Sequence, residues 1–295
     1  MSAPLGFILL THGGPRQSLR LMDRLNAMFN FPPIVWHHDF SKCALPETKF
    51  PPNVSFVRPH VKTNWTEFSV VQAELRAMAQ MYERPDAPER FVLLSGADYP
   101  IKPARQIIAD LQAGDFDGHL DFRRISEEDQ STPHLTTLYR RHICFNFPPA
   151  PLFRWMNRRW PMFTRPYRGP FKRLLPFSRE LECYAGSQWF VGSRRVAEYI
   201  LEFHRTKPKL ARFYRWTMFP DESYFHTIVM NAESRLKINN NNWRYLDWSE
   251  CEIHPKTLKM EDLPKLLASP HHFARKFNLE VDAEIFDRLD EFTRA

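Results

Sequence analysis

Short apolar runs alternate with helical patterns through the first hundred residues. Four runs have the length and residue types of strands: 7–11, 34–39, 54–57 and 91–94. Residues 17–29 and 69–82 place their apolar side chains at helical spacing. Strands and helices in this order, joined by short loops, favour an α/β fold with a mainly parallel central sheet flanked by helices.

Polar residues stand at the ends of three of these predicted strands. They are His12, Asp39 and Asp98. Ligands of parallel sheets bind beyond the carboxyl ends of the strands. We therefore expect the functional site at this edge, with His12 as a candidate ligand contact, although a single histidine is more often a packed or surface residue.

Residues 145–177 depart from this pattern, because aromatic residues, prolines and basic residues are interleaved there. The prolines exclude one long helix, and the aromatic content is untypical of a linker. Such a composition suits a saccharide platform, an interfacial patch on anionic lipid, or a single-stranded nucleic-acid site. We favour acceptor or membrane contact and expect no nucleic-acid partner, since no nucleic-acid-binding signature accompanies the segment.

Regular patterns resume after this segment. We expect strands at 187–192 and 244–246, and helices at 194–204, 221–231, 261–268 and 282–293. No internal repeat is visible. The chain therefore reads as one domain spanning 1–295, with 145–177 as an insertion and 278–295 as a C-terminal helix.

Composition limits the class of protein. The 295 residues are 43% hydrophobic, enough for a substantial core, and the formal charge of +7 favours anionic partners such as nucleotide phosphates, acidic glycans or a membrane surface. The four cysteines lack the spacing of a zinc site or an evident disulfide framework. No apolar run is long enough to span a membrane. We expect a cytoplasmic protein, with peripheral contact at the inner membrane face left open.

The sequence Pro220-Asp221-Glu222 places two adjacent carboxylates at the start of the predicted helix 221–231. Adjacent helical residues point about 100° apart, so one acid can face a cleft while Asp221 caps the helix. A carboxylate held against an acceptor hydroxyl is a sufficient general base for glycosyl transfer with inversion. The alternative is that both acids only interact with the helix dipole.

Two further features suit a nucleotide-sugar site. Asp98 lies in a turn that begins at Ser95, where a carboxylate can hold a ribose or a base, although the residue types are equally those of a plain β-turn. Arg244, Arg275 and Lys276 are candidates to stabilise a departing nucleoside diphosphate, the alternative being a solvated basic surface.

An Asp-x-Asp sequence, which binds a divalent metal in many sugar-nucleotide transferases, occurs once, at Asp115 and Asp117. It falls in a glycine-flanked loop after a predicted helix, not at the end of a buried strand. We therefore expect no metal and no other cofactor, with the diphosphate charge neutralised by protein cations.

Ordered along the chain, these motifs resemble the core-2/I-branching enzymes. That family, glycosyltransferase family 14, includes branching β-1,6-N-acetylglucosaminyltransferases and peptide O-xylosyltransferases. Each matching motif is weak alone, but their order is specific. The matching segments are 7–12, 64–71, 74–75, 93–102, 186–190, 220–222 with Phe225, 244–248, 254–258 and 273–277.

The resemblance implies a GT-A-like fold and an inverting, metal-independent transfer from a UDP-sugar to a glycan or glycoconjugate. Glu222 falls on the general base of the family. The implied donor contacts are Asp98, Ser95, His12, Arg244, Arg275 and Lys276. Trp189, as an aromatic sugar platform, joins Gln188 and Asp221 on the acceptor side.

One departure from the family bears on the acceptor. Animal members carry an N-terminal membrane helix that this sequence does not show, so we expect a short, bacterial-type form acting on a polysaccharide or lipid-linked glycan precursor. The donor sugar stays open between xylose and N-acetylglucosamine. The alternative function is a non-catalytic glycan-, lipid- or nucleic-acid-binding module that uses residues 145–177.

Overall fold

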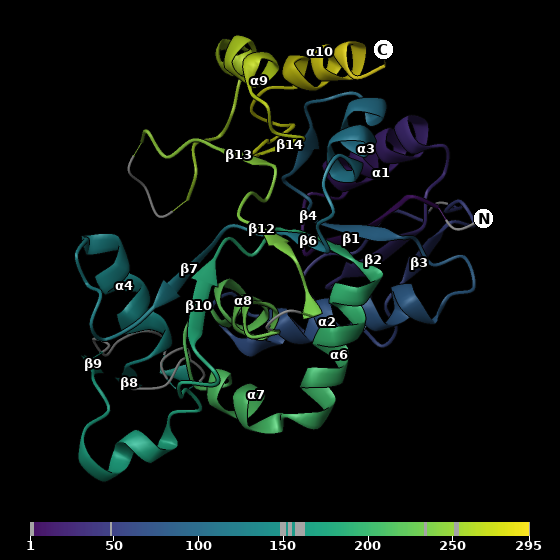
Figure 1. Ribbon diagram of the computed structural model, residues 1–295. Helices are drawn as coiled ribbons and strands as arrows, with labels where there is room; N and C mark the ends of the chain where they lie inside the picture. Colours follow the sequence, from purple (N-terminus) through teal and green to yellow (C-terminus); the bar gives the residue numbers. More distant parts are fainter. Residues whose placement is uncertain are drawn as a thin grey trace.

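A central seven-stranded sheet organises the fold (Figure 1), with the strand order β12-β6-β11-β4-β1-β2-β3. The computed structural model describes residues 3–47, 49–147, 152, 155–156, 163–232, 235–250 and 254–294. Within this part of the chain, the predicted mixed α/β architecture with a mainly parallel central sheet is confirmed.

The first half of the chain builds the parallel part of this sheet. Its strands are β1 (Leu5–Thr11), β2 (Ile34–His38), β3 (Val54–Phe56) and β4 (Arg90–Ser95). β1 lies between β2 and β4, and all neighbours run parallel. The helices that connect them are α1 (Pro15–Phe29) and α2 (Phe68–Glu83). All of these elements lie where the hydrophobic periodicity predicts them.

The pleat of β1 explains why helices cover both faces of the sheet. Phe7 and Leu9 pack into one buried cluster with α1, whereas Ile8, on the opposite face, packs into a second cluster with α2. α3 (Ala104–Gln112), α9 (Leu263–Ala268) and α10 (Glu284–Phe292) join the first cluster, above the sheet in Figure 1. The second cluster, below the sheet, includes α6 (Arg194–Thr206), α7 (Pro208–Tyr214) and α8 (Tyr224–Met230).

The predicted strand 187–192 is wrong in its bounds. β11 (Val191–Ser193) completes the main sheet antiparallel to β4, beside β6 (Gly118–His119) and β12 (Ile238–Asn239). The preceding residues form β10 (Cys183–Gly186), which pairs with β7 (Phe122–Ile125) in a separate sheet. Trp189 and Phe190 lie between the two strands, where burial accounts for their apolar character.

The predicted helix 221–231 is also divided. A 3-10 turn, η2 (Pro220–Glu222), precedes α8, and Ser223 between them has φ −139° and ψ −33°. The buried Ser223 hydroxyl donates to the Tyr184 carbonyl at 2.7 Å and bonds the Tyr214 hydroxyl at 2.6 Å, which holds this break. No side chain caps either helix start, so the predicted capping role of Asp221 is wrong.

A small third sheet connects the C-terminal region to the turn after β4. It consists of β13 (Arg244–Leu246), β14 (Phe273–Arg275) and β5 (Tyr99–Pro100). β14 pairs with both of the others, and η4 (Met260–Asp262) leads into α9 before it. This sheet brings Arg244 and Arg275, from the C-terminal part of the chain, close to the turn that begins at Ser95.

Residues 145–177 form no single helix over the positions that the structure describes. β8 (Phe145–Phe147) pairs antiparallel with β9 (Phe163–Arg165), and η1 (Gly169–Leu174) follows. β8 and β9 lie beside α4 (Pro133–His142) at one corner of the molecule (Figure 1). Across the described residues, none of the helices has both the length and the apolar character needed to cross a bilayer.

Candidate active site

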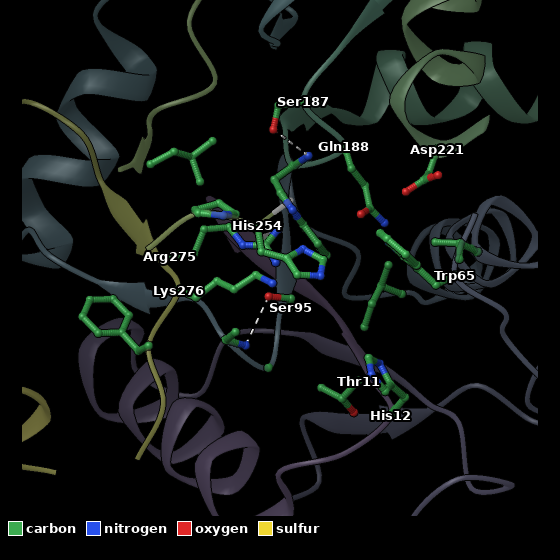
Figure 2. Close-up of a pocket in the computed structure, with 18 of the residues that line it drawn as sticks. Thr11, His12, Trp65, Ser95, Ser187, Gln188, Asp221, His254, Arg275 and Lys276 are labelled. Atoms are coloured by element: carbon green, nitrogen blue, oxygen red, sulfur yellow. Dashed lines mark hydrogen bonds between the residues drawn. The ribbon is translucent and has the colours of Figure 1, made fainter. Parts of the chain in front are cut away.

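A cleft of about 1730 Å³ lies beyond the carboxyl ends of β1 and β4. Its walls come from the loops after these strands, the end of β10, η2, α4 and the segment after β14. Eight of the ten predicted site residues line it: His12, Ser95, Gln188, Trp189, Asp221, Glu222, Arg275 and Lys276. Figure 2 shows Lys276 extending toward Ser95, with Asp221 on the far side of Gln188.

Asp98 and Arg244 are not among the residues that line the cleft. Both side chains are fully buried, and Arg244 Nη1 lies 3.0 Å from Asp98 Oδ1. Arg244 Nη2 also donates to the Leu93 carbonyl at 3.0 Å, and burial lowers the pKa of Arg244 to about 10. Asp98 Oδ2 accepts hydrogen bonds from the Ser95 hydroxyl and, at 2.7 Å, from the Ser95 amide. This ion pair therefore holds the turn that presents Ser95.

Arg275 and Lys276 are the cations at the carboxyl end of β14. Burial lowers the pKa of both side chains. The guanidinium carbon of Arg275 lies 4.5 Å from the centre of the Trp189 ring, a cation–π contact. Trp189 is only 7% exposed and therefore offers little ring surface as the predicted sugar platform. The tryptophans of the cleft wall that are about half exposed are Trp65 and Trp248.

Glu222 lies in the cleft wall with 31% of its side chain exposed. Burial, reinforced by the negative charge of Asp221, raises the pKa of Glu222 to about 7. Arg141 opposes this shift, because its Nη1 lies 3.2 Å from Glu222 Oε2. Burial also raises the pKa of Asp221, whose Oδ1 has no hydrogen-bond partner among the described residues. Glu222 therefore lines the cleft and has a pKa near neutral pH.

Glu74 belongs to this acidic cluster and was not predicted. Its Oε1 accepts a hydrogen bond of 2.5 Å from the Gln188 side-chain amide. Burial, with the charge of Asp221, raises the pKa of Glu74 well above its usual range. The sequence carries a signal for it, because Glu74 follows Val71 by three residues and precedes Met78 by four, so an acid stands on the buried stripe of α2.

Arg141, the other residue that sequence reasoning missed, comes from the last turn of α4. Besides pairing with Glu222, its guanidinium carbon lies 4.4 Å from the centre of the Phe219 ring. No pattern near Arg141 distinguishes it from the neighbouring Arg140 in the sequence, since only the approach of α4 to η2 selects one of them.

The remaining candidates from the sequence have varied surroundings. His12 is exposed and lines the cleft. Asp39 is buried and accepts hydrogen bonds of 2.8 Å from both the amide and the hydroxyl of Thr63, which makes it an anchor for that loop. Asp117 pairs with Arg195 at 2.8 Å, and neither Asp117 nor Asp115 lines the cleft. The described residues contain no group of three His, Cys, Asp or Glu side chains arranged to hold a metal ion.

The chain is similar to xylosyltransferases from several mammals. It is 25% identical to xylosyltransferase 1 of Homo sapiens over 312 residues, which cover 98% of this chain and 30% of that protein. It is 24% identical to xylosyltransferase 2 of Rattus norvegicus over 258 residues, or 81% of this chain and 27% of that protein. The chain thus spans less than a third of the length of these two relatives.

Among the solved structures that align with the chain, one covers nearly all of it. It is the galactosyltransferase LgtC in complex with donor and acceptor sugar analogues, with a TM-score of 0.40 and 8% identity over 98% of this chain and 96% of that one. The match that decides the family is of another kind: the profile of the Core-2/I-Branching enzyme covers residues 5–268. The chain belongs to the Core-2/I-Branching enzyme family, as its ordered motifs predicted.

Proposed function

We propose that this protein transfers a sugar from a UDP-sugar to a hydroxyl of a glycan or glycoconjugate with inversion at the anomeric carbon. The observation that carries the proposal is Glu222, a cleft carboxyl whose pKa burial raises to about 7. A general base works best when its pKa lies near the working pH. The names of the xylosyltransferase relatives favour xylose as the transferred sugar, with N-acetylglucosamine as the alternative.

In the proposed reaction, the acceptor oxygen attacks the anomeric carbon from the face opposite to the UDP. Its proton passes to the Glu222 carboxylate, a bond forms between the acceptor oxygen and the anomeric carbon, and the electron pair of the broken carbon–oxygen bond leaves with the β-phosphate. The leaving UDP gains negative charge, and our proposal is that Arg275 and Lys276, which line the cleft, stabilise it. We propose that these cations take the role that a divalent metal has in other transferases.

Other residues position the reactants in this proposal. The buried pair of Asp98 and Arg244 holds the Ser95 turn against which the donor docks. Trp65 and Trp248 expose ring surface in the same cleft, where an acceptor sugar can stack. A cytoplasmic site of action, as expected from the sequence, is part of the same proposal.

The test is a panel of UDP-sugars assayed by UDP release, with and without glycan acceptors. We expect release to require acceptor, and Glu222→Gln to lower kcat by about 10²–10⁴ while UDP binding is retained. Glu198→Gln, which changes an exposed acid of α6, is the matched control. Activity of Glu222→Gln near that of the control would exclude Glu222 as the base.

Three further outcomes test other parts of the proposal. UDP release that does not depend on any acceptor would identify a UDP-sugar hydrolase instead. Turnover abolished by EDTA and restored by manganese would contradict the metal-independent mechanism. Stabilisation by polyanions but not by UDP in thermal unfolding would favour the non-catalytic binding module.

A further inference from the structure

The net positive charge of the chain is located in one segment. Residues 145–177 hold seven of the 41 Lys and Arg residues and none of the 34 Asp and Glu residues. The rest of the chain therefore carries 34 basic and 34 acidic residues, and its formal charge is zero. The formal charge of +7 thus belongs to this segment alone.

The strand pair in this segment turns an apolar face to solvent. In the antiparallel register, Phe147 lies opposite Phe163 and Phe145 lies opposite Arg165, so all four side chains share one face of the pair. All four are exposed. Asn146 points to the other face, where it is buried and donates to the Cys144 carbonyl at 3.1 Å. The polarity of this strand is therefore the reverse of that expected when the outer face of a sheet meets water.

The 3-10 helix η1 continues the same character. Phe171 and Leu174 are each 64% exposed, and Lys172 and Arg173 between them are exposed as well. Lys172 Nζ lies 3.6 Å from Glu127 Oε2 in a solvent-exposed pair. Arg173 has no ion-pair partner among the described residues.

Exposed apolar side chains are more frequent in this part of the sequence than in the rest of the described chain. Of the thirteen large hydrophobic residues that the structure shows as exposed, seven lie between 145 and 174. Single exposed hydrophobic residues are normal, whereas a contiguous group indicates an interaction site. We define the β8–β9–η1 surface as Phe145, Phe147, Phe163, Arg165, Arg168, Phe171, Lys172, Arg173 and Leu174.

We propose that the β8–β9–η1 surface binds the anionic face of a lipid bilayer. Phenylalanine and leucine side chains insert at the boundary of headgroups and acyl chains, while the flanking guanidinium and ammonium groups contact lipid phosphates. A single-stranded nucleic acid would satisfy the cations and stack bases on the phenylalanines, but it would leave the aliphatic Leu174 in water. An apolar protein partner would leave the four cations of this surface, Arg165, Arg168, Lys172 and Arg173, unmatched.

The position of this surface also orients the cleft. β8 follows α4 after two residues, and α4 supplies Pro133, His134, Thr137, Leu138 and Arg141 to the cleft wall. A bilayer that holds β8, β9 and η1 therefore lies near this wall of the cleft. Lipid binding stands independently of sugar transfer, because none of the residues of the β8–β9–η1 surface lines the cleft.

The test is co-sedimentation of the full chain with vesicles of phosphatidylcholine alone or with 30% phosphatidylglycerol (roughly the charge density of an anionic membrane). We expect binding to the anionic vesicles only, weakened by added salt because exposed charges are screened. Each Lys or Arg near such a surface contributes a factor of about five, so Arg165→Gln, Arg168→Gln and Arg173→Gln combined should weaken binding about a hundredfold.

The controls make comparable changes at exposed residues outside this surface. Arg105→Gln, Lys265→Gln and Arg294→Gln combined remove three exposed charges near α3, α9 and α10 and should leave binding unchanged. Phe171→Ser should weaken binding about tenfold. Phe31→Ser, at a residue 59% exposed, should have no effect on binding. Unchanged thermal unfolding of each variant shows that the fold is retained.

Three results would overturn the proposal. One is equal loss of binding in the two charge triples, because net charge alone would then explain the attraction. Another is equal binding to neutral and anionic vesicles. The third is tighter binding to single-stranded DNA than to anionic vesicles, which would assign the surface to nucleic acid.

Discussion

Arg244 and Asp98 form an ion pair of 3.0 Å in which both side chains are fully buried. The pair joins β13, late in the chain, to the turn that follows β4. The same carboxylate accepts hydrogen bonds from the Ser95 amide and hydroxyl. The position of Ser95 in the cleft therefore depends on a contact between distant parts of the sequence.

Arg244→Met should destabilise the protein strongly, by about 3–5 kcal/mol, because it leaves the Asp98 carboxylate buried without its cation. Urea denaturation measures this loss. Removing the carboxylate as well, in Arg244→Met with Asp98→Asn, should recover part of the stability. Arg205→Met, which breaks an exposed pair with Glu202, should change stability by less than about 1 kcal/mol. Equal effects of the two arginine substitutions would contradict the buried pair.

Arg141→Met should move the pH dependence of sugar transfer. Arg141 lowers the pKa of Glu222, so its loss should raise that pKa above about 7. The rise of kcat/KM with pH should then shift to higher pH by about one unit. Rate profiles from pH 5 to 9 measure the shift, with Arg205→Met as the control. A profile that keeps its midpoint would show that Glu222 does not set the rise.

Lys276→Ala should weaken UDP binding while leaving uridine binding unchanged. The lost interaction is a charge-assisted contact with phosphate, so the Kd of UDP should rise about tenfold or more. Titration calorimetry with UDP and uridine separates diphosphate from nucleoside contacts. Lys237→Ala, an exposed lysine away from the cleft, should leave both constants unchanged. An equal loss of affinity for uridine would assign Lys276 to the nucleoside.

Glu74→Gln should increase stability more at high pH than at low pH. The folded protein binds the Glu74 proton more tightly than the unfolded chain, in which the pKa is about 4.5, so this carboxyl lowers stability as pH rises above that value. Each pH unit between the unfolded and folded pKa costs at most about 1.4 kcal/mol. Thermal unfolding of variant and parent from pH 5 to 8 measures the difference.

Glu198→Gln provides the control for that experiment, because Glu198 is exposed. Its stability difference from the parent should not change with pH. If the Glu74→Gln difference is equally flat across the range, Glu74 is ionised in the folded protein and its assigned raised pKa is wrong.

The elements of the parallel half could be predicted because local patterns specify them. β1 and β4 are short apolar runs, and α2 has a continuous buried stripe. The division of 183–193 between two sheets could not be predicted in this way. Trp189 and Phe190 are as apolar as strand residues, yet they are buried in a connection, and a pattern of hydrophobicity does not distinguish the two.

Candidate residues were found in the sequence more readily than the position of each side chain. Sequence motifs identified Glu222, Asp98 and Arg244, but not that Asp98 and Arg244 pair with each other behind the cleft wall. The motifs also did not reveal that Trp189 lies against Arg275. These contacts join segments far apart in the chain, so the spacing of neighbouring residues cannot predict them.

By itself, the sequence determined the fold class, the family and the residues from which a site is built, because periodicity and motif order are properties of the linear chain. Only the tertiary structure decided which of these residues reach the cleft. Burial and the charge of Asp221 raise the pKa of Glu222, and Arg141 arrives beside it from α4. The pKa of a carboxyl depends on its burial and on the charges near it. Both are set by segments that come together only when the chain has folded.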